Sequence, residues 1–255
     1  MRHWKIEDYR IDIVVEGYPG KSVCHGALGW SSIVLLRGHG HIALVDVGAF
    51  GIRKTLINRL ADYGLRPADV TDVLLTHSHY DHSVNWTLFR HARIVIGGEE
   101  LDWSVGEPWG ESPVPELYVR ELQTWPTLAR ARDGEEVLPR ITAHAAPGHT
   151  PGHLIFVLQG RDYDVVFTGD AAKNRAELLS RSTDMTFDPA VSAASIDKIW
   201  TFWKRREDSV LVPGHDLPMV LEAGVPRFLG QREAAISAWM GDDLDETQLF
   251  RLSGQ

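Results

Sequence analysis

The stretch DVLLTHSHYDHSVN, residues 72–85, combines a short apolar run with a dense cluster of ligand-type side chains. The apolar run predicts a buried strand, and the turn after it carries His77, His79, Asp81 and His82. Imidazole and carboxylate groups suit zinc, iron, cobalt or manganese, and the lack of thiolates here disfavours a purely structural zinc site. A surface histidine cluster would not normally follow a buried strand. The stretch therefore predicts a metal site at a strand end.

Three later turns carry ligand-type residues in similar positions. APGHTPGH places His149 in a Gly/Pro-rich turn, VFTGDAAK places Asp170 directly after an apolar strand, and VLVPGHD places His215 in the same way. Loops at strand ends are where sheet proteins gather binding residues, so we expect these turns to converge with the first one. His153, the second histidine of GHTPGH, is interpreted as support for its turn rather than as a ligand.

The remaining pattern predicts two related halves, each with a sheet and helices, in one domain over 1–255. Apolar runs and alternation predict the strands, and apolar residues at helical spacing predict the helices. Trp200 and Trp203 lie on an amphipathic helix and are assigned to the core. The chain from about residue 225 is expected to be helical and to end in an acidic tail. Strands are predicted at 10–18, 31–38, 42–48, 72–76, 92–97, 140–147, 153–160, 163–169 and 209–216, and helices at 52–63, 85–89 and 192–205.

A Trp- and Pro-rich segment at about 98–133 interrupts this order. Its prolines break any long element, so short helices and loops are predicted, forming a cap-like insertion. Together with the loop 17–30, this segment is expected to wall a pocket above the metals. Trp30, Trp103 and Trp109 are the candidate contacts for an apolar part of a substrate, although tryptophans more often belong to a core or an interface.

Composition limits the classes of function. The chain has 255 residues, 44% of them hydrophobic, which is enough for a substantial core. Its formal net charge of −9 disfavours nucleic acid and anionic membranes as partners. Cys24 is the only cysteine, so an intrachain disulfide is excluded. Because the sequence has no signal-peptide pattern and no long apolar run, we expect a soluble, cytoplasmic protein. We further expect a small-molecule substrate, and the protein could form a homodimer.

The series HxHxDH, GH, GD and GH, in this order, resembles the metallo-β-lactamase superfamily over nearly the whole chain, from the first hairpin to His215. The resemblance implies an α/β fold, an αββα sandwich of two mixed sheets flanked by helices. It also implies two divalent metal ions, zinc in the first place, with manganese, iron or cobalt as alternatives. By this resemblance the first metal would bind His77, His79 and His149, the second Asp81, His82 and His215, and Asp170 would bridge both.

Two branches of the superfamily share the similarity. TGDAAKN…FDPAVSAASIDKIW…VLVPGHD resembles the N-acyl-homoserine lactone hydrolases, and LVDVGAFG…LRPADVTDVLLTHSHYDHSVNWTLF resembles the small metallo-β-lactamase domain-containing hydrolases. The lactone hydrolases carry a tyrosine three residues after the bridging aspartate, where this chain has Lys173. A lysine there could polarise an oxyanion or bind a carboxylate, or it could point to solvent.

The resemblance implies a hydrolase that uses a metal-bridging hydroxide to open a lactone or a related cyclic ester or amide. Asp81, Asp170 and Lys173 are the expected catalytic residues. A thioesterase of the glyoxalase II type would have the same ligands, and a mononuclear-iron sulfur dioxygenase is a redox alternative. A serine hydrolase lacks its GxSxG motif here. Asp46 is expected to orient a ligating histidine, with a simple turn aspartate as the alternative.

Overall fold

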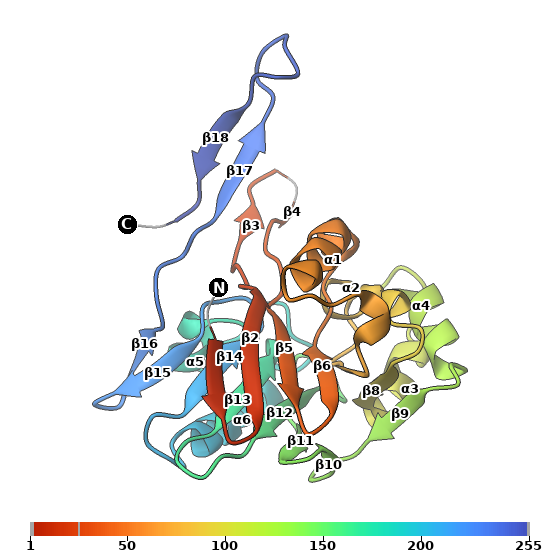
Figure 1. Ribbon diagram of the computed structural model, residues 1–255, viewed down its shortest axis with the longest axis vertical. Helices are drawn as coiled ribbons and strands as arrows, with labels where there is room; N and C mark the ends of the chain where they lie inside the picture. Colours follow the sequence, from red (N-terminus) through yellow and green to blue (C-terminus); the bar gives the residue numbers. More distant parts are fainter. Residues whose placement is uncertain (1–2, 25, 254–255) are drawn as a thin grey trace.

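The computed structural model describes residues 3–24 and 26–253, and its centre is a pair of seven-stranded sheets (Figure 1). Both sheets are mixed, because each contains parallel as well as antiparallel pairs. One apolar cluster lies between the sheets, and two others lie between a sheet and its helices. This arrangement confirms the predicted αββα sandwich and its two related halves.

The first sheet has the order β1-β2-β5-β6-β7-β8-β9. Its β5–β6 hairpin is the one predicted from the sequence, and β6 to β9 run parallel to one another. The carboxyl ends of these parallel strands therefore meet at one edge of the sheet. The strands are β1 (His3–Ile6), β2 (Tyr9–Val15), β5 (Ile33–Gly38), β6 (His41–Val45), β7 (Asp72–Leu74), β8 (Arg93–Gly97) and β9 (Leu128–Ala131), with β3 (Lys21–Ser22) and β4 (Gly26–Ala27) as a separate pair.

The second sheet has the order β10-β11-β12-β13-β14-β15-β16. Its central strands read as continuous apolar runs, such as LIFVL in β12, because both of their faces are covered. Phe156 and Phe167 lie opposite each other there and are buried against the first sheet, which stabilises the sandwich by about 1.5–3 kcal/mol for each side chain. The strands are β10 (Glu136–Leu138), β11 (Ile141–Ala145), β12 (Leu154–Leu158), β13 (Val165–Gly169), β14 (Val210–Pro213), β15 (Met219–Glu222) and β16 (Val225–Phe228).

Helices cover the outer face of each sheet. The longest, α6, begins where Asp188 accepts hydrogen bonds from the backbone N–H groups of Ala190 and Val191, with Pro189 in the first turn. Trp203 at its end is fully buried, which confirms its assignment to the core. The helices are α1 (Arg53–Asp62), α2 (Tyr80–Ser83), α3 (Gly98–Gly106), α4 (Glu116–Gln123), α5 (Arg175–Ser180) and α6 (Pro189–Trp203), with 3-10 turns η1 (Phe50–Ile52), η2 (Pro67–Asp69), η3 (Val84–Leu88) and η4 (Asp170–Ala172).

Two segments differ from the sequence prediction. The region 98–133 contains the short helices α3 and α4, but its end forms β9, a strand at the edge of the first sheet, rather than a loop. The chain from Val225 is not helical: β16 joins the second sheet, and β17 (Ala235–Ala238) pairs with β18 (Gln248–Arg251) in a hairpin that projects from the body (Figure 1). Pro226 suits the edge strand β16, where a missing N–H costs little, and would interrupt a helix.

In the described part of the chain, none of the helices combines the length and the apolar character that a membrane span requires.

Candidate metal centre

The histidine turn begins directly after β7, at the sheet edge where the parallel strands end. His77 is fully buried, and its Nδ1 lies 3.0 Å from the hydroxyl of Thr76. Its Nε2 is buried without a hydrogen-bond partner among the described residues. A buried polar atom without a partner is costly, so this nitrogen is suited to a ligand that would occupy the space it faces.

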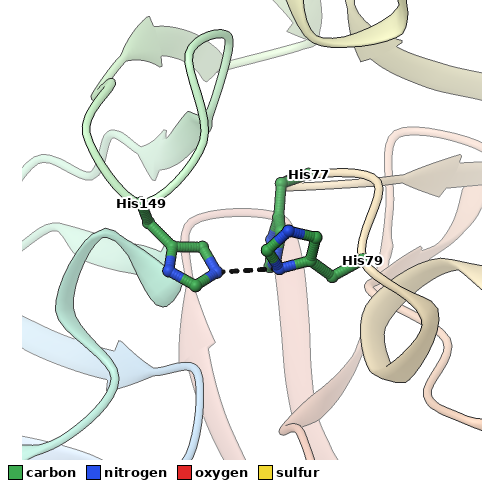
Figure 2. Close-up of side chains that lie close together, drawn as sticks. All are labelled: His77, His79 and His149. Carbon is green, nitrogen blue, oxygen red and sulfur yellow. Dashed lines mark hydrogen bonds between the residues drawn. The ribbon is translucent and has the colours of Figure 1, made fainter. Parts of the chain in front are cut away.

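Three imidazoles form the first ligand group, which we define as His77, His79 and His149. They come from two loops, and one ligand nitrogen from each lies within 4.8 Å of the others. Nε2 of His149 is 3.0 Å from Nδ1 of His79, and a dashed line marks this contact in Figure 2. Burial lowers the pKa of His79 to about 4 and holds the pKa values of His77 and His149 well below their usual range. The group is therefore neutral at pH 7, the form in which imidazole binds a metal.

Glycine makes the His149 turn possible. Gly148 has a φ of +127°, and a Cβ there would overlap the backbone of Ser192 at the start of α6. The carbonyl of Gly148 accepts a hydrogen bond of 2.7 Å from the hydroxyl of Thr186. The turn is thus pressed against α6, and this contact directs His149 toward the histidine turn of the other half.

The second ligand group, defined as Asp81, His82 and His215, contains a carboxylate. Its ligand atoms also lie within 4.8 Å of one another, with Nε2 of His215 3.3 Å from Oδ2 of Asp81. Burial by itself would lower the pKa of His215, but the carboxylates of Asp170 and Asp81 outweigh it and raise that pKa to about 9. Burial would also lower the pKa of His82, but the carboxylates of Asp170 and Asp81 outweigh burial and raise that pKa well above its usual range. This group attracts positive charge.

Asp170 lies between the two groups. Its Oδ1 is 3.1 Å from Nε2 of His82 and 3.3 Å from Nε2 of His215, whereas its Oδ2 is 3.5 Å from Nε2 of His149. Burial would raise the pKa of Asp170, but His215 and His82 hold it well below its usual range. One carboxylate oxygen thus faces each ligand group.

Two further buried residues contact members of the ligand groups or Asp170. Asp46 accepts hydrogen bonds from the N–H and hydroxyl of Thr76, and its Oδ2 is 2.8 Å from Nδ1 of His82. The expectation that Asp46 orients a histidine is confirmed. His153 accepts a hydrogen bond of 3.1 Å from the backbone N–H of Asp170 and stacks on His77, with ring centroids 4.8 Å apart. Its side chain thus supports the turn of Asp170, whereas the sequence had assigned it to its own turn.

Lys173 follows Asp170 and does not point to solvent. Its side chain is only 15% exposed, and its Nζ lies 3.2 Å from Oε1 of Glu177. Its carbonyl accepts a hydrogen bond of 2.7 Å from the N–H of His215. The ammonium group also contributes, after burial, to the lowered pKa of His79. The positive charge therefore lies near enough to the first ligand group to oppose protonation of His79.

Of the three candidate wall tryptophans, only Trp103 contacts the ligand groups in the described structure. Its ring centroid is 6.3 Å from that of His79 and 6.3 Å from that of Phe187. Trp30 instead stacks on Tyr18 and donates its indole N–H to a backbone carbonyl. Trp109 is 58% exposed, with a guanidinium group over its ring.

Sequence reasoning missed two buried glutamates. Glu100 accepts hydrogen bonds from Ser78 and Thr150, and burial raises its pKa despite these bonds. Glu177 accepts hydrogen bonds from the backbone N–H groups of Lys173 and Asp184. Neither glutamate directly follows a strand, because Glu100 comes three residues after β8 and Glu177 lies beyond η4. The available signal was weak: each glutamate lies in the first turn of a short helix after a turn that carries glycine or asparagine.

The donor set fits divalent metal ions, because it combines neutral imidazoles, carboxylates and buried atoms without partners. A profile of the metallo-β-lactamase superfamily matches residues 28–215. This chain belongs to the metallo-β-lactamase superfamily. The match includes the six residues of the two ligand groups, and it also includes Asp170.

Relatives of this superfamily member include both branches that the motifs suggested. It is 28% identical to metallo-beta-lactamase domain-containing protein 1 of Xenopus laevis, in an alignment over 82% of this chain and 81% of that protein. It is 24% identical to an N-acyl homoserine lactonase of Bacillus thuringiensis, over 64% and 62% of the two chains.

A solved structure of an N-acyl homoserine lactone hydrolase with the product N-hexanoyl-L-homoserine at its metal centre superimposes with a TM-score of 0.67. The superposition covers 84% of this chain and 94% of that one, at 17% identity. At that identity the likeness shows a shared fold.

Proposed function

We propose that this superfamily member is a dinuclear metal-dependent hydrolase that opens a lactone or a related cyclic ester or amide. The observation that carries the proposal is the position of Asp170, whose two carboxylate oxygens face different ligand groups. A carboxylate in this position can bind two cations at once. Its surroundings supply imidazole and carboxylate ligands on both sides, and the lactonase relatives support the choice of reaction.

Each ligand group would hold one ion. His77, His79 and His149 would hold the first ion as neutral imidazoles, and Asp81, His82 and His215 would hold the second. Asp170 would bind both. Zinc suits this nitrogen and oxygen environment, and manganese, iron and cobalt also accept it.

When bound, a pair of divalent ions supplies a nucleophile derived from water at neutral pH and polarises a substrate carbonyl. The side chains of the protein hold and orient the groups around the metal site. Asp46 holds His82 through Nδ1, which leaves Nε2 directed at the site. We further propose that Asp170, which lies between the two groups, would receive a proton and pass it to a leaving oxygen.

Lys173 would bind an oxygen of the substrate. Its Nζ has one carboxylate neighbour, Oε1 of Glu177, and an ammonium group carries three N–H donors. Donors therefore remain for a carbonyl oxygen that gains negative charge or for a substrate carboxylate. Trp103, close to His79, would contact an apolar part of the substrate.

The decisive experiment is a substrate panel on protein of measured metal content. Lactones, thioesters, β-lactams and phosphodiesters should be compared, and we expect fast turnover of a lactone with two metals per chain. A preference for thioesters would replace the lactonase proposal with a thioesterase of the glyoxalase II type. One iron per chain with oxygen uptake would instead indicate a sulfur dioxygenase. Chelation should abolish turnover, and added zinc should restore it.

A further inference from the structure

A single buried carboxylate joins the two loops of the first ligand group. Glu100 lies in the first turn of α3 and is completely buried. Its Oε1 accepts hydrogen bonds from the N–H and the hydroxyl of Ser78, at 2.8 and 2.7 Å. Its Oε2 accepts hydrogen bonds from the hydroxyl of Thr150 and the N–H of Gly152, at 2.6 and 3.2 Å. The carboxylate has four donors and no basic side chain among them.

The partners of Glu100 are sequence neighbours of the ligands. Ser78 lies between His77 and His79, and Thr150 directly follows His149. The two loops belong to different halves of the sandwich, whose backbones are joined at the base of the loops by a hydrogen bond of 2.8 Å from Leu154 N–H to the carbonyl of Thr76. The carboxylate of Glu100 therefore provides a direct connection between the loops that carry the three imidazoles.

The backbone is shaped around this connection. A Cβ at Gly152 would overlap the backbone nitrogen of Glu100, and a Cβ at Gly97 would lie 2.7 Å from the carbonyl oxygen of Gly152. Both glycines let the His149 loop approach the start of α3 closely. The close approach places two donors of that loop on one oxygen of the carboxylate.

We propose that Glu100 is the positioning residue of the first ligand group, which sets the distance between His149 and the pair His77 and His79. It does not touch a reacting atom. Residues that orient metal ligands typically affect metal affinity 10- to 100-fold. The inference rests on the proposed metal binding, but not on the identity of the substrate.

The test is Glu100→Gln, with Glu99→Gln as the matched control. The glutamine keeps the shape, but its NH₂ group must face the N–H of Ser78 or of Gly152, neither of which can accept a hydrogen bond. Glu99 is exposed in the same helical turn and loses the same charge on substitution. Metal-loaded full-length protein should be dialysed against graded chelator, and the retained metal measured by mass spectrometry.

We expect Glu100→Gln to lose one of two metals at about 10- to 100-fold lower chelator concentration than the wild type and Glu99→Gln. The lost metal is identified by combining the change with ligand variants. With His149→Ala, Glu100→Gln should cause no further loss, whereas with His215→Ala it should leave the protein without tightly held metal. Equal weakening of both metals, or unchanged retention, would overturn the proposal.

Circular dichroism and thermal unfolding establish whether Glu100→Gln is folded. If it is not, Ser78→Ala and Thr150→Val decide, because each removes one hydroxyl donor and leaves the carboxylate in place. Selective loss of one metal in both variants supports the proposal, and unchanged retention in both contradicts it. A protein that binds two metals in this way but hydrolyses no lactone or related cyclic ester or amide would refute the proposed function alone.

Discussion

The two ligand groups lie side by side but differ in charge. Burial keeps the pKa values of His77, His79 and His149 low and the imidazoles neutral, and for His79 and His149 it outweighs nearby carboxylates. His82 and His215 face the carboxylates of Asp81 and Asp170, which raise their pKa values despite equal burial. The comparison teaches that one short turn, residues 77–82, supplies two different electrostatic environments. Asp170 marks the boundary between them.

The groups also differ in how they are held. The first depends on hydrogen bonds from loop atoms to Glu100, a residue outside the histidine motifs. The second depends on Asp46, whose carboxylate contacts His82 directly. Changes near one group should therefore affect that group first.

The largest effect is expected from Asp170→Asn and His79→Ala. Asp170→Asn removes the charge that both groups share, and His79→Ala removes one ligand of the first group. Each should lower kcat/KM by about 1,000-fold or more, which corresponds to about 4 kcal/mol of transition-state stabilisation, while the fold is largely retained. Steady-state kinetics with circular dichroism check this. Full activity of either variant after metal removal would end the proposed mechanism.

An intermediate effect is expected from adding one methyl group beside each ligand group. Gly148→Ala would overlap Ser192 behind His149, and Gly214→Ala would overlap the carboxylate of Asp170. We expect a loss of metal affinity of about 10- to 100-fold in each variant, confined to the first metal for Gly148→Ala. Gly51→Ala is the control, because a Cβ there meets no atom within 4 Å. Metal analysis after dialysis would contradict the comparison if Gly148→Ala also lost the second ion.

A smaller effect is expected from Lys173→Ala. Loss of one ammonium donor should reduce kcat/KM about 10-fold, or about 1.4 kcal/mol, and leave the metal content unchanged. Lys54→Ala, at an exposed position of α1, should change neither quantity. Unaltered kinetics of Lys173→Ala would remove this residue from the catalytic groups.

The smallest effect concerns Asp72, a buried carboxylate outside both ligand groups. Burial would raise its pKa, but hydrogen bonds from Thr71, His41 and Arg93 outweigh burial and lower it. Its contribution to stability is therefore present above the unfolded-state pKa and is lost as pH falls through the folded-state value. Asp72→Asn should destabilise the fold by about 1 kcal/mol at pH 7, with unchanged turnover. Urea unfolding should show this difference shrinking below about pH 3.8; a constant difference would contradict it.

Local patterns predicted most of the fold. The runs DVLLT and HLIFVLQG became β7 and β12 because a continuous apolar segment of that length is stable only when covered on both faces. The prediction of a helix after Val225 failed. The edge strands there are short, their alternation of apolar and polar residues is weak, and only the partner strand decides how they pair. The sequence prediction also failed at β9, a short strand with the sequence LARA, which contains no β-branched or aromatic residue and is not identified as a strand without β8 beside it.

The amino-acid sequence by itself predicted the candidate ligand set, because each candidate follows a strand or lies in a Gly-containing turn whose local chemistry is readable along the chain. Only the tertiary structure decided that the two oxygens of Asp170 face different groups, and that Glu100 and Glu177 are buried beside them. The physical reason is distance along the chain. A buried polar side chain is hydrogen-bonded by whichever loops lie next to it in the folded protein. Hydrophobic periodicity along the sequence does not predict which loops those are.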